Sequence, residues 1–463
     1  MAQILNYIYI ACAVVILFGA AIFVHEFGHF WVARWRGLKV LEFSIGFGPK
    51  IFGWRRKDID YSVRWIPFGG YVKLPQLVTS AVEGKTPEGE QYPPVSPFSK
   101  ILVSVAGPLM NIVFAFVIAT FLHFVGVPVL INPSIIGNVD PHSEEAKMGI
   151  QSGDRIVAVD GKPVRSWQDV FNITMLATTT NRLPVAIERN GVTNTYKLQT
   201  VVKEMANSIK VKMLNLESND RLLVKNVSSG SPAETAGLKS KDEIETFAGL
   251  PVTSYDQFVK LVQKREGQPT PIDIKRGGKV ISLTVSPHFD PSTRRSRIGI
   301  EFDLRDHYQI EHPTPWEQVS YDLNQIWDTV RALIHTRQSG VTVSELSGPV
   351  GIIQFLAIQV KTDWRLALRF FVFLSINLGI LNLLPLPVLD GGHIVMSLIE
   401  GIRRKPLSPK LVEYTFTVFA ILLISFILYV TFADIKRISI FRSVFQHETH
   451  IEQPAKPATN PAK

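Results

Sequence analysis

Residues 4–33 read ILNYIYIACAVVILFGAAIFVHEFGHFWVA, an apolar run that holds one acid, Glu26, and no Lys or Arg. A helix needs about 20 mainly apolar residues to cross a bilayer, so this run predicts a membrane span. A secretory signal peptide would have a shorter apolar run, a preceding basic residue and a small-residue cleavage site, and the sequence lacks these features. The fold is therefore expected to rest on membrane-spanning helices.

Three further apolar stretches qualify as spans. They are residues 101–131, 370–389 and 411–432. Four spans place both ends of the chain on the same side of the membrane. The sequence thus predicts a polytopic α-helical membrane core in two parts, residues 1–131 and 366–433.

Basic residues near the spans indicate an orientation. Arg34, Arg36 and Lys39 follow the first span, and residues 403–405 read RRK between the third and fourth spans. Loops rich in Lys and Arg tend to stay in the cytoplasm. Both termini and the long segment 132–365 are then expected outside the cytoplasm.

Composition excludes several classes of protein. The chain has 463 residues, 46% of them hydrophobic and 19% charged, so it is not an intrinsically disordered chain. A single cysteine, Cys12, excludes an intramolecular disulfide. The net charge of +9 comes largely from residues that flank the spans. We therefore expect a lipid bilayer as the partner, and no nucleic acid.

The long loop contains an internal repeat. GIQSGDRIVAVDGKPVRSW begins at Gly149, and GLKSKDEIETFAGLPVTSY begins at Gly237. Each copy has the pattern of a strand, a short helix, a strand and turn, a helix and a strand pair. Two tandem α+β domains are predicted, over residues 132–219 and 220–309.

The first span carries a pattern typical of metal sites. His25 and His29 are four residues apart, so a helix places both imidazoles on one face, with Glu26 between them. The alternative is a pair of structural histidines at a helix end. Ionisable groups inside an apolar span are costly and usually functional, which favours a metal. A Zn²⁺ ion is the expected cofactor, although two histidines and a carboxylate would also suit other divalent ions.

Asp390 is the expected third ligand. It follows NLLPLPVL at residues 382–389, where Pro385 and Pro387 prevent a regular helix. Irregular backbone at membrane depth is tolerated where protein or water covers it. A helix cap near the membrane surface is the alternative role for Asp390, while His393 and His123 are other possible ligands.

The remaining segments predict further structure, and for two of them the sequence allows more than one placement. Residues 40–75 contain short strands with Gly46 and Gly48, which predict a hairpin. The family resemblance given below implies a membrane-associated β-hairpin or sheet here, and a plain cytoplasmic hairpin is the alternative. Apolar residues recur at helical spacing from residue 316 to residue 334, within a connector over 310–365. This helix could lie on the membrane or pack on the second α+β domain. Residues 434–463 are expected to form an interfacial helix followed by a disordered tail.

These motifs together resemble the site-2 protease family of intramembrane metalloproteases. The resemblance rests on HEFGH at residues 25–29 and LDG at 389–391, and on further short motifs. The further motifs are GFG at 46–48, PFGGYV at 67–72, AGP at 106–108 with Asn111, SGPV at 347–350 and NLLPLPVLDG at 382–391. It implies a multi-pass protein of the bacterial inner membrane, with the active site toward the cytoplasmic side.

The resemblance also implies roles for single residues. His25, His29 and Asp390 would bind zinc, and Glu26 would act as the general base, although Glu26 as a fourth ligand is a competing role. Substrate-binding residues would be Gly46, Gly48, Asn377, Asn382, Pro385 and Pro387. Asn377 and Asn382 could instead join helices. The substrates implied are single-span membrane proteins, namely a trimmed anti-sigma factor and remnant signal peptides.

The α+β pair resembles PDZ domains, which bind peptides by adding a strand to a sheet edge. Ile298, Gly299 and Ile300 would form the peptide-carboxylate loop of the second copy, unless Gly299 is only a strand glycine. The first copy has no glycine at the matching place. The competing function is a non-catalytic membrane-anchored PDZ scaffold with a structural metal site. A transporter is disfavoured because the four spans show no inverted repeat.

Overall fold

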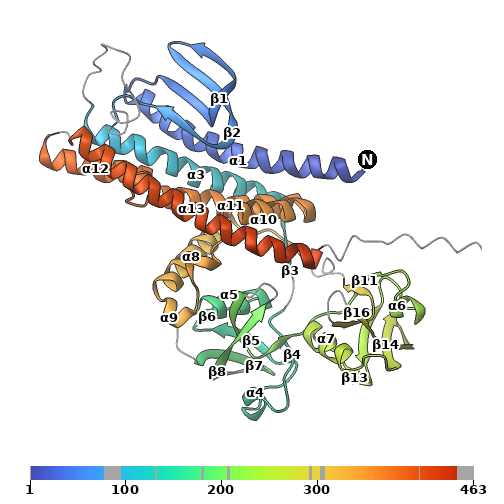
Figure 1. Ribbon diagram of the computed structural model, residues 1–463. Coiled ribbons are helices and arrows are strands. Elements are labelled where there is room, and N and C mark those ends of the chain that lie inside the picture. The colour runs from blue at the N-terminus through green and yellow to red at the C-terminus, as the bar shows by residue number, and fades with distance from the viewer. Residues whose placement is uncertain are drawn as a thin grey trace, which may run out of the picture.

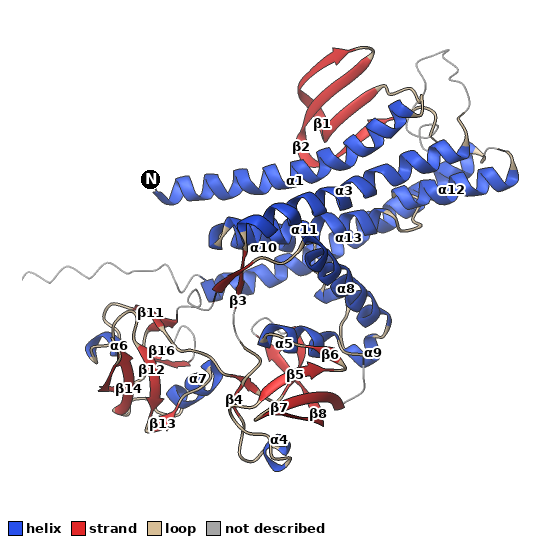
Figure 2. Cartoon of the chain, turned by 180° about the vertical axis from the view of Figure 1, so that it is seen from behind, coloured by secondary structure: helices blue, strands red, loops and turns tan. Residues whose placement is uncertain are grey.

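The computed structural model of the chain describes residues 2–77, 95–130, 133–178, 182–205, 209–290, 295–302, 308–405 and 407–445. Long helices form a bundle, a twisted sheet lies on one side of it, and two α+β domains lie on the other side (Figures 1 and 2).

Within the described ranges, four helices are long and apolar enough to cross a membrane. They are α1 (Ala2–Trp35), α3 (Pro97–Val125), α11 (Trp364–Asn382) and α13 (Pro409–Phe445). Helix α3 is the most buried of them and packs against α1, α11 and α12 (Asp390–Arg403). The membrane core is therefore arranged around α3.

The second span ends earlier than the apolar run at residues 101–131 predicts. Helix α3 stops at Val125, because Gly126 takes a left-handed backbone with φ +81°. The chain continues as strand β3 (Val127–Leu130), which pairs antiparallel with β19 (Tyr308–Glu311). Hydropathy does not distinguish the end of an apolar helix from an apolar strand.

The third span differs from the predicted range 370–389 at both ends. Helix α11 begins at Trp364, where the side chain of Asp363 accepts the backbone N–H of Arg365, and it ends at Asn382. Arg369 lies inside this helix, paired with the buried carboxylate of Asp322. Because this partner is remote in sequence, the apolar pattern alone placed the start of the helix too late.

The fourth span and the expected interfacial helix are one helix. Helix α13 continues without a break from Pro409 to Phe445, so the boundary predicted near residue 433 is absent. The predicted tail lies outside the described residues beyond 445. The expected connector also contains a helix that the apolar pattern did not reveal, α10 (Pro349–Thr362), which packs on α1, α11 and α13.

The sheet beside α1 consists of two strands, β1 (Glu42–Arg56) and β2 (Ile59–Lys73). Lys57 and Asp58 form the turn, with φ values of +48° and +62°. The first part of β1 pairs on one side with residues 60–63 and on the other side with residues 70–73 of β2. The long strands thus fold back on themselves, and Gly70–Lys73 forms an outer edge of the sheet.

The two repeats form two α+β domains, each with its own apolar core. The first contains β4 (Ile136–Asn138), α4 (Glu144–Lys147), β5 (Arg155–Val159), β6 (Lys162–Pro163), α5 (Trp167–Leu176), β7 (Arg182–Arg189), β8 (Val192–Met205), β9 (Ile209–Leu214) and β10 (Glu217–Ser218). Its main sheet has the order β6-β5-β7-β8-β9.

The second domain repeats this order of elements as far as the strand pair that follows its longer helix, and then differs. It contains β11 (Val224–Val227), α6 (Pro232–Thr235), β12 (Glu243–Phe247), β13 (Leu250–Pro251), α7 (Tyr255–Gln263), β14 (Thr270–Arg276), β15 (Lys279–Val285), β16 (His288–Asp290), β17 (Arg295–Arg297) and β18 (Ile300–Phe302). Its main sheet has the order β13-β12-β14-β15.

Helix α8 (Pro315–Ile334) joins the first α+β domain to the bundle. It packs mainly on α3 and α11 of the bundle and also contacts α5 of the first α+β domain, whereas the two alternatives from the sequence were the membrane surface and the second α+β domain. Lys162 of the first domain forms an ion pair of 2.5 Å with Asp328. The short helix α9 (Thr336–Ser339) follows, and the carbonyl of Gln338 accepts a hydrogen bond of 3.3 Å from the ammonium of Lys212.

Candidate metal centre

Two imidazoles of α1 meet inside the bundle. The Nε2 atoms of His25 and His29 are 3.2 Å apart, and both residues are about nine-tenths buried. Glycines create the space: a Cβ on Gly28 would lie 2.4 Å from the carbonyl oxygen of Ala106, and one on Gly107 would lie 2.2 Å from His29 Nε2. The close contact of α1 with α3 therefore depends on two glycines.

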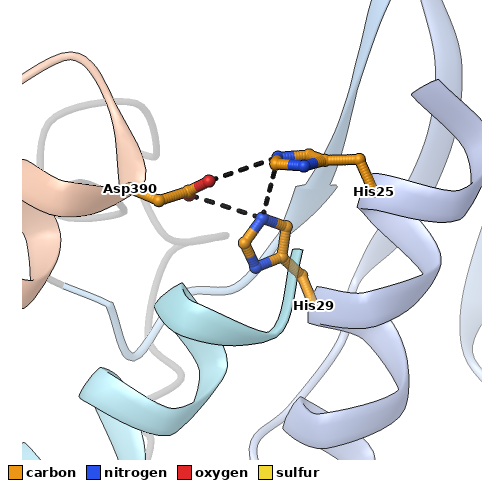
Figure 3. Close-up of side chains that lie close together, drawn as sticks. All are labelled: His25, His29 and Asp390. Atoms are coloured by element: carbon orange, nitrogen blue, oxygen red, sulfur yellow. Dashed lines mark hydrogen bonds and ion pairs between the residues drawn. The ribbon is translucent and has the colours of Figure 1, made fainter. Parts of the chain in front are cut away.

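Asp390 reaches the same point from α12 (Figure 3). Its Oδ2 lies 3.2 Å from His25 Nε2, and its Oδ1 lies 3.3 Å from His29 Nε2. The turn before it is tight, because a Cβ on Gly391 would lie 2.2 Å from the Leu384 carbonyl oxygen. The break after α11 thus aims the first carboxylate of α12 at the two histidines.

The three side chains fit a zinc ion. Donor atoms held at about 2.0–2.1 Å from zinc in a tetrahedron are about 3.3 Å apart. The two Nε2 atoms are 3.2 Å apart, close to this value, and one donor atom from each of the three residues lies within 4.8 Å of the other two. Within the described part of the chain, His25, His29 and Asp390 are the one group of three such side chains close enough to share an ion. Glu26, His123 and His393 do not belong to this group.

The Nδ1 atom of each imidazole, which faces away from the ligand cluster, also has a partner. His29 Nδ1 lies 2.7 Å from the carbonyl oxygen of Val103, an acceptor that keeps the proton on Nδ1 and leaves Nε2 for a metal. His25 Nδ1 lies 3.2 Å from the side-chain amide nitrogen of Asn111, whose Oδ1 is buried without a partner among the described residues. Exchanging the oxygen and nitrogen of this amide lets His25 donate to Oδ1. A metal on His25 Nε2 requires that arrangement.

Glu26 lies beside the outer edge of the sheet. Its side chain is buried, and the backbone N–H of Val72 lies beside its carboxylate. Gly70 allows this approach, since a Cβ there would lie 3.0 Å from Glu26 Cγ. The carboxylate thus lies between the metal ligands of its own helix and the edge strand.

The other expected site residues lie at different distances from this centre. Asn382 Nδ2 is 3.4 Å from His25 Nε2, at the end of α11. Asn377 lies half-buried farther along α11, Pro385 and Pro387 lie in the break, and Gly46 and Gly48 lie on β1 with φ values of +87° and +83°. His123 is instead bonded through Nδ1 to the carbonyl of His312, at 3.0 Å.

Three contributors to the site were not assigned a role from the residues alone. They are the Val103 carbonyl, Asn111 and the Val72 N–H. The amide of Asn111 inside an apolar span was the available signal, because a polar side chain there needs a partner. The two backbone groups could not be identified from the sequence.

Comparisons with known proteins cover almost the whole chain. The model of peptidase family M50 matches residues 13–426. Protease RseP of Yersinia pestis is 30% identical over 453 residues, which cover 92% of this chain and 98% of that protein. Regulator of sigma-E protease RseP of Escherichia coli K12 is 30% identical over 457 residues, which cover 94% of this chain and 100% of that protein.

A protein of Pasteurella multocida named as a zinc metalloprotease is 29% identical over 463 residues, covering 94% of this chain and 100% of that protein. Among solved structures, a PDZ domain of an SdrC-like protein from Listeria monocytogenes is 23% identical, with a TM-score of 0.17, and covers 19% of this chain and 95% of that chain. The extent of the family match identifies the chain: it belongs to peptidase family M50, the site-2 type metalloproteases.

Proposed function

We propose that this protease cleaves single-span membrane proteins within or near their transmembrane segment. The observation that carries the proposal is the depth of the ligand cluster. His25 lies ten residues before the end of α1 at Trp35, which is about 15 Å along a helix axis. Since the hydrocarbon core is about 30 Å thick, the cluster would lie inside it, approached from the cytoplasmic end of α1.

His25, His29 and Asp390 would hold the zinc ion, with the coordination position opposite them left to water or substrate. A zinc ion in such a site lowers the pKa of bound water and polarises the scissile carbonyl. The Val103 carbonyl and Asn111 orient the two imidazoles. The chain itself thus supplies ligands whose ring orientation is fixed before substrate arrives.

Glu26 would act as the general base. Its carboxylate adjoins two ligands on the same helix but is not one of the three grouped donors. We propose that it takes the proton of the attacking water and passes it to the leaving amine nitrogen. Burial removes competing bulk water, and the Val72 N–H lies beside the carboxylate.

The substrate would bind as an extended strand. A helical segment hides its carbonyls in hydrogen bonds, so it must unwind before attack. Residues Gly70–Lys73 pair with β1 on one side, and the Val72 N–H on the other side points to Glu26. We propose that the substrate adds to this edge, with Gly46 and Gly48 shaping the adjacent strand.

Side chains at the end of α11 would complete the substrate site. Asn382 is close enough to the cluster to bind a substrate carbonyl beside the metal, and Asn377 lies farther along the same helix. Pro385 and Pro387 would keep the break open. These roles follow the family resemblance and the position of Asn382.

The second α+β domain would bind peptide in a PDZ-like groove. Gly299 has φ +81°, and a Cβ there would lie 2.3 Å from Ser231 Cβ, so the Ile298–Ile300 loop requires glycine. Strand β18 follows directly, and its Phe302 packs edge-on against Tyr255 and Phe258 of α7. In the first domain, Lys212 instead bonds the Ala177 carbonyl at the end of α5. We propose that the second domain binds peptide and that the pair screens substrates by size.

The proposed location is the bacterial inner membrane, with both termini and the α+β domains periplasmic and the active site toward the cytoplasmic side. Arg34, Arg36 and residues 403–405 on one side support this orientation. The relatives named regulator of sigma-E protease support an anti-sigma factor as one substrate class, and remnant signal peptides are the second class.

The test is cleavage of a single-span reporter by the full-length protein in proteoliposomes, with the cut mapped by mass spectrometry. We expect a chelator-sensitive cut inside the apolar segment. Asp390→Ala should lose zinc and activity, whereas the control Asp256→Ala, on the exposed face of α7, should keep both. A wild-type protein without metal and without cleavage would support the PDZ scaffold instead.

A further inference from the structure

The outer part of the twisted sheet carries an unusual density of basic charge. Residues 34–73 hold nine Lys and Arg residues and three Asp and Glu residues, a net charge of +6 out of +9 for the whole chain. We define residues Phe47–Ile66 as the arm. Figures 1 and 2 show the sheet standing out from the bundle beside α1. The arm itself holds five Lys and Arg residues and two Asp residues, a net charge of +3, and Arg34, Arg36 and Lys39 add three positive charges between the end of α1 and the sheet.

The arm also exposes large apolar side chains. Phe52 and Trp65 are 63% and 67% exposed. Other exposed members are Phe47, Ile51, Trp54, Val63 and Ile66. A water-facing hairpin would rarely carry so many, and contiguous apolar surface of this kind marks an interaction site.

The depth at which the sheet contacts α1 identifies what surrounds the arm. Phe43 packs on Phe23 and Phe30 of α1, with ring centroids 5.9 and 5.4 Å apart. Phe30 lies five residues before Trp35, about 8 Å along the helix. Phe23 lies twelve residues before Trp35, about 18 Å along the helix. In the proposed membrane placement, the sheet therefore joins α1 within the hydrocarbon core, and the exposed apolar side chains of the arm are surrounded by lipid. Trp31 and Trp35, 60% and 72% exposed, mark the boundary between acyl chains and headgroups on α1.

The basic residues of the arm are available to a ligand. Lys50, Arg55, Arg56 and Lys57 are exposed, and none forms an ion pair with a described acid. Arg64 differs, since it bonds Glu42 at 2.6 Å, Ser44 at 3.0 Å and the Gly48 carbonyl at 2.7 Å. Arg64 therefore stiffens the sheet, while the tip presents four cations.

We propose that the arm binds the phosphates of anionic lipids in the cytoplasmic leaflet, with its aromatic side chains inserted between the acyl chains. Lys and Arg extend their charged heads to the headgroup layer while their stems and the neighbouring rings stay apolar. Anionic lipid would hold the arm at one depth and so fix the edge strand beside Glu26. The inference rests on the proposed membrane placement but not on proteolysis.

The test places an environment-sensitive fluorophore on the arm. In a Cys12→Ser background, Phe52→Cys is labelled with NBD, and the full chain is reconstituted in nanodiscs of phosphatidylcholine with or without phosphatidylglycerol. We expect emission to shift to the blue with phosphatidylglycerol, and added salt to reverse this shift. Arg55→Ser/Arg56→Ser should abolish it. The matched control Arg403→Ser/Lys405→Ser removes two charges from the same proposed face and should leave the shift intact.

Equal emission in both lipids would overturn the proposal, as would a shift that survives Arg55→Ser/Arg56→Ser or disappears in the control variant. Fluorescence is read in the catalytically inactive Glu26→Gln background as well. If this variant shows the lipid-dependent shift while the wild-type protein cleaves no reporter, the lipid site is supported and only the proposed protease function fails.

Discussion

The side-chain amide of Asn111 lies 3.2 Å from Nδ1 of His25, on the other side of the ring from the Nε2 atom that faces Asp390. Outer contacts of this kind fix the tautomer of a metal ligand. We expect Asn111→Leu to reduce zinc affinity by about 10–100-fold while the protein still folds. Competition with a chelator measures the affinity. Ser104→Ala, at another buried polar position of α3, is the control; an equal loss there would contradict a specific role for Asn111.

The glycines of α1 give a steric prediction. A Cβ on Gly28 would lie 2.4 Å from backbone of α3, whereas one on Gly19 would meet nothing within 4 Å. Gly28→Ala should therefore destabilise the bundle by about 1–3 kcal/mol and lower the zinc content. Gly19→Ala should be neutral or stabilising by up to about 1 kcal/mol. Thermal unfolding and metal analysis of the two variants check this, and similar behaviour of both would refute the close helix contact.

The buried ion pair between α8 and α11 is expected to matter more than an exposed one. Asp322 is 1% exposed and accepts two hydrogen bonds from Arg369, at 2.7 and 2.8 Å. Asp322→Ala should cost about 3–5 kcal/mol, because it leaves a cation without its partner. Asp328→Ala, on the same helix, breaks the more exposed pair with Lys162 and should cost less than about 1 kcal/mol. Equal shifts of the unfolding temperature would contradict the assignment.

The first α+β domain should lose stability in acid. Burial acts to raise the pKa of Asp154, but hydrogen bonds from Arg189 and the Gln151 N–H outweigh it and hold that pKa below its ordinary value. Because the native pKa is below the unfolded value of about 3.9, the stabilisation is complete above that pH. It is lost as the pH falls from there through the native pKa.

Hydrogen exchange of β5 and β7 across a pH series measures this effect in the full-length protein. Asp154→Asn should weaken protection at neutral pH by about 1–3 kcal/mol and flatten the acid response. The second domain has the matching pair Asp242 and Arg276, 2.6 Å apart, and provides the internal control. If Asp154→Asn left the acid response of the first domain unchanged, this carboxylate would not be its source.

Much of the fold could be predicted from local patterns. The four apolar runs correspond to four long helices, and the repeat corresponds to two domains that share their order of elements from the first strand to the strand pair. Errors arose where a distant residue decides the outcome. Arg369 can lie inside α11 because Asp322 neutralises it, and apolar residues 127–130 form a strand because β19 pairs with them. The periodicity of apolar residues does not reveal either partner, Asp322 or β19.

The candidate site likewise contains side chains that the sequence could predict and backbone groups that it could not. His25 and His29 are linked by helical spacing, and Asp390 by an unusual break in an apolar run, so the sequence could nominate all three. The structure brings their donor atoms together. The carbonyl of Val103 and the N–H of Val72 could not be nominated, because every residue carries these groups and packing alone selects among them.

The central claim is that Glu26 acts as the base at a zinc site built by His25, His29 and Asp390. The most direct measurement is zinc content and cleavage rate of Glu26→Gln beside the wild-type protein, in the same proteoliposomes and with the same single-span reporter. We predict unchanged zinc per chain and a cleavage rate lower by about 10²–10⁴-fold. A variant that cleaves at the wild-type rate would contradict the base assignment, and one that has lost its zinc would make Glu26 a ligand.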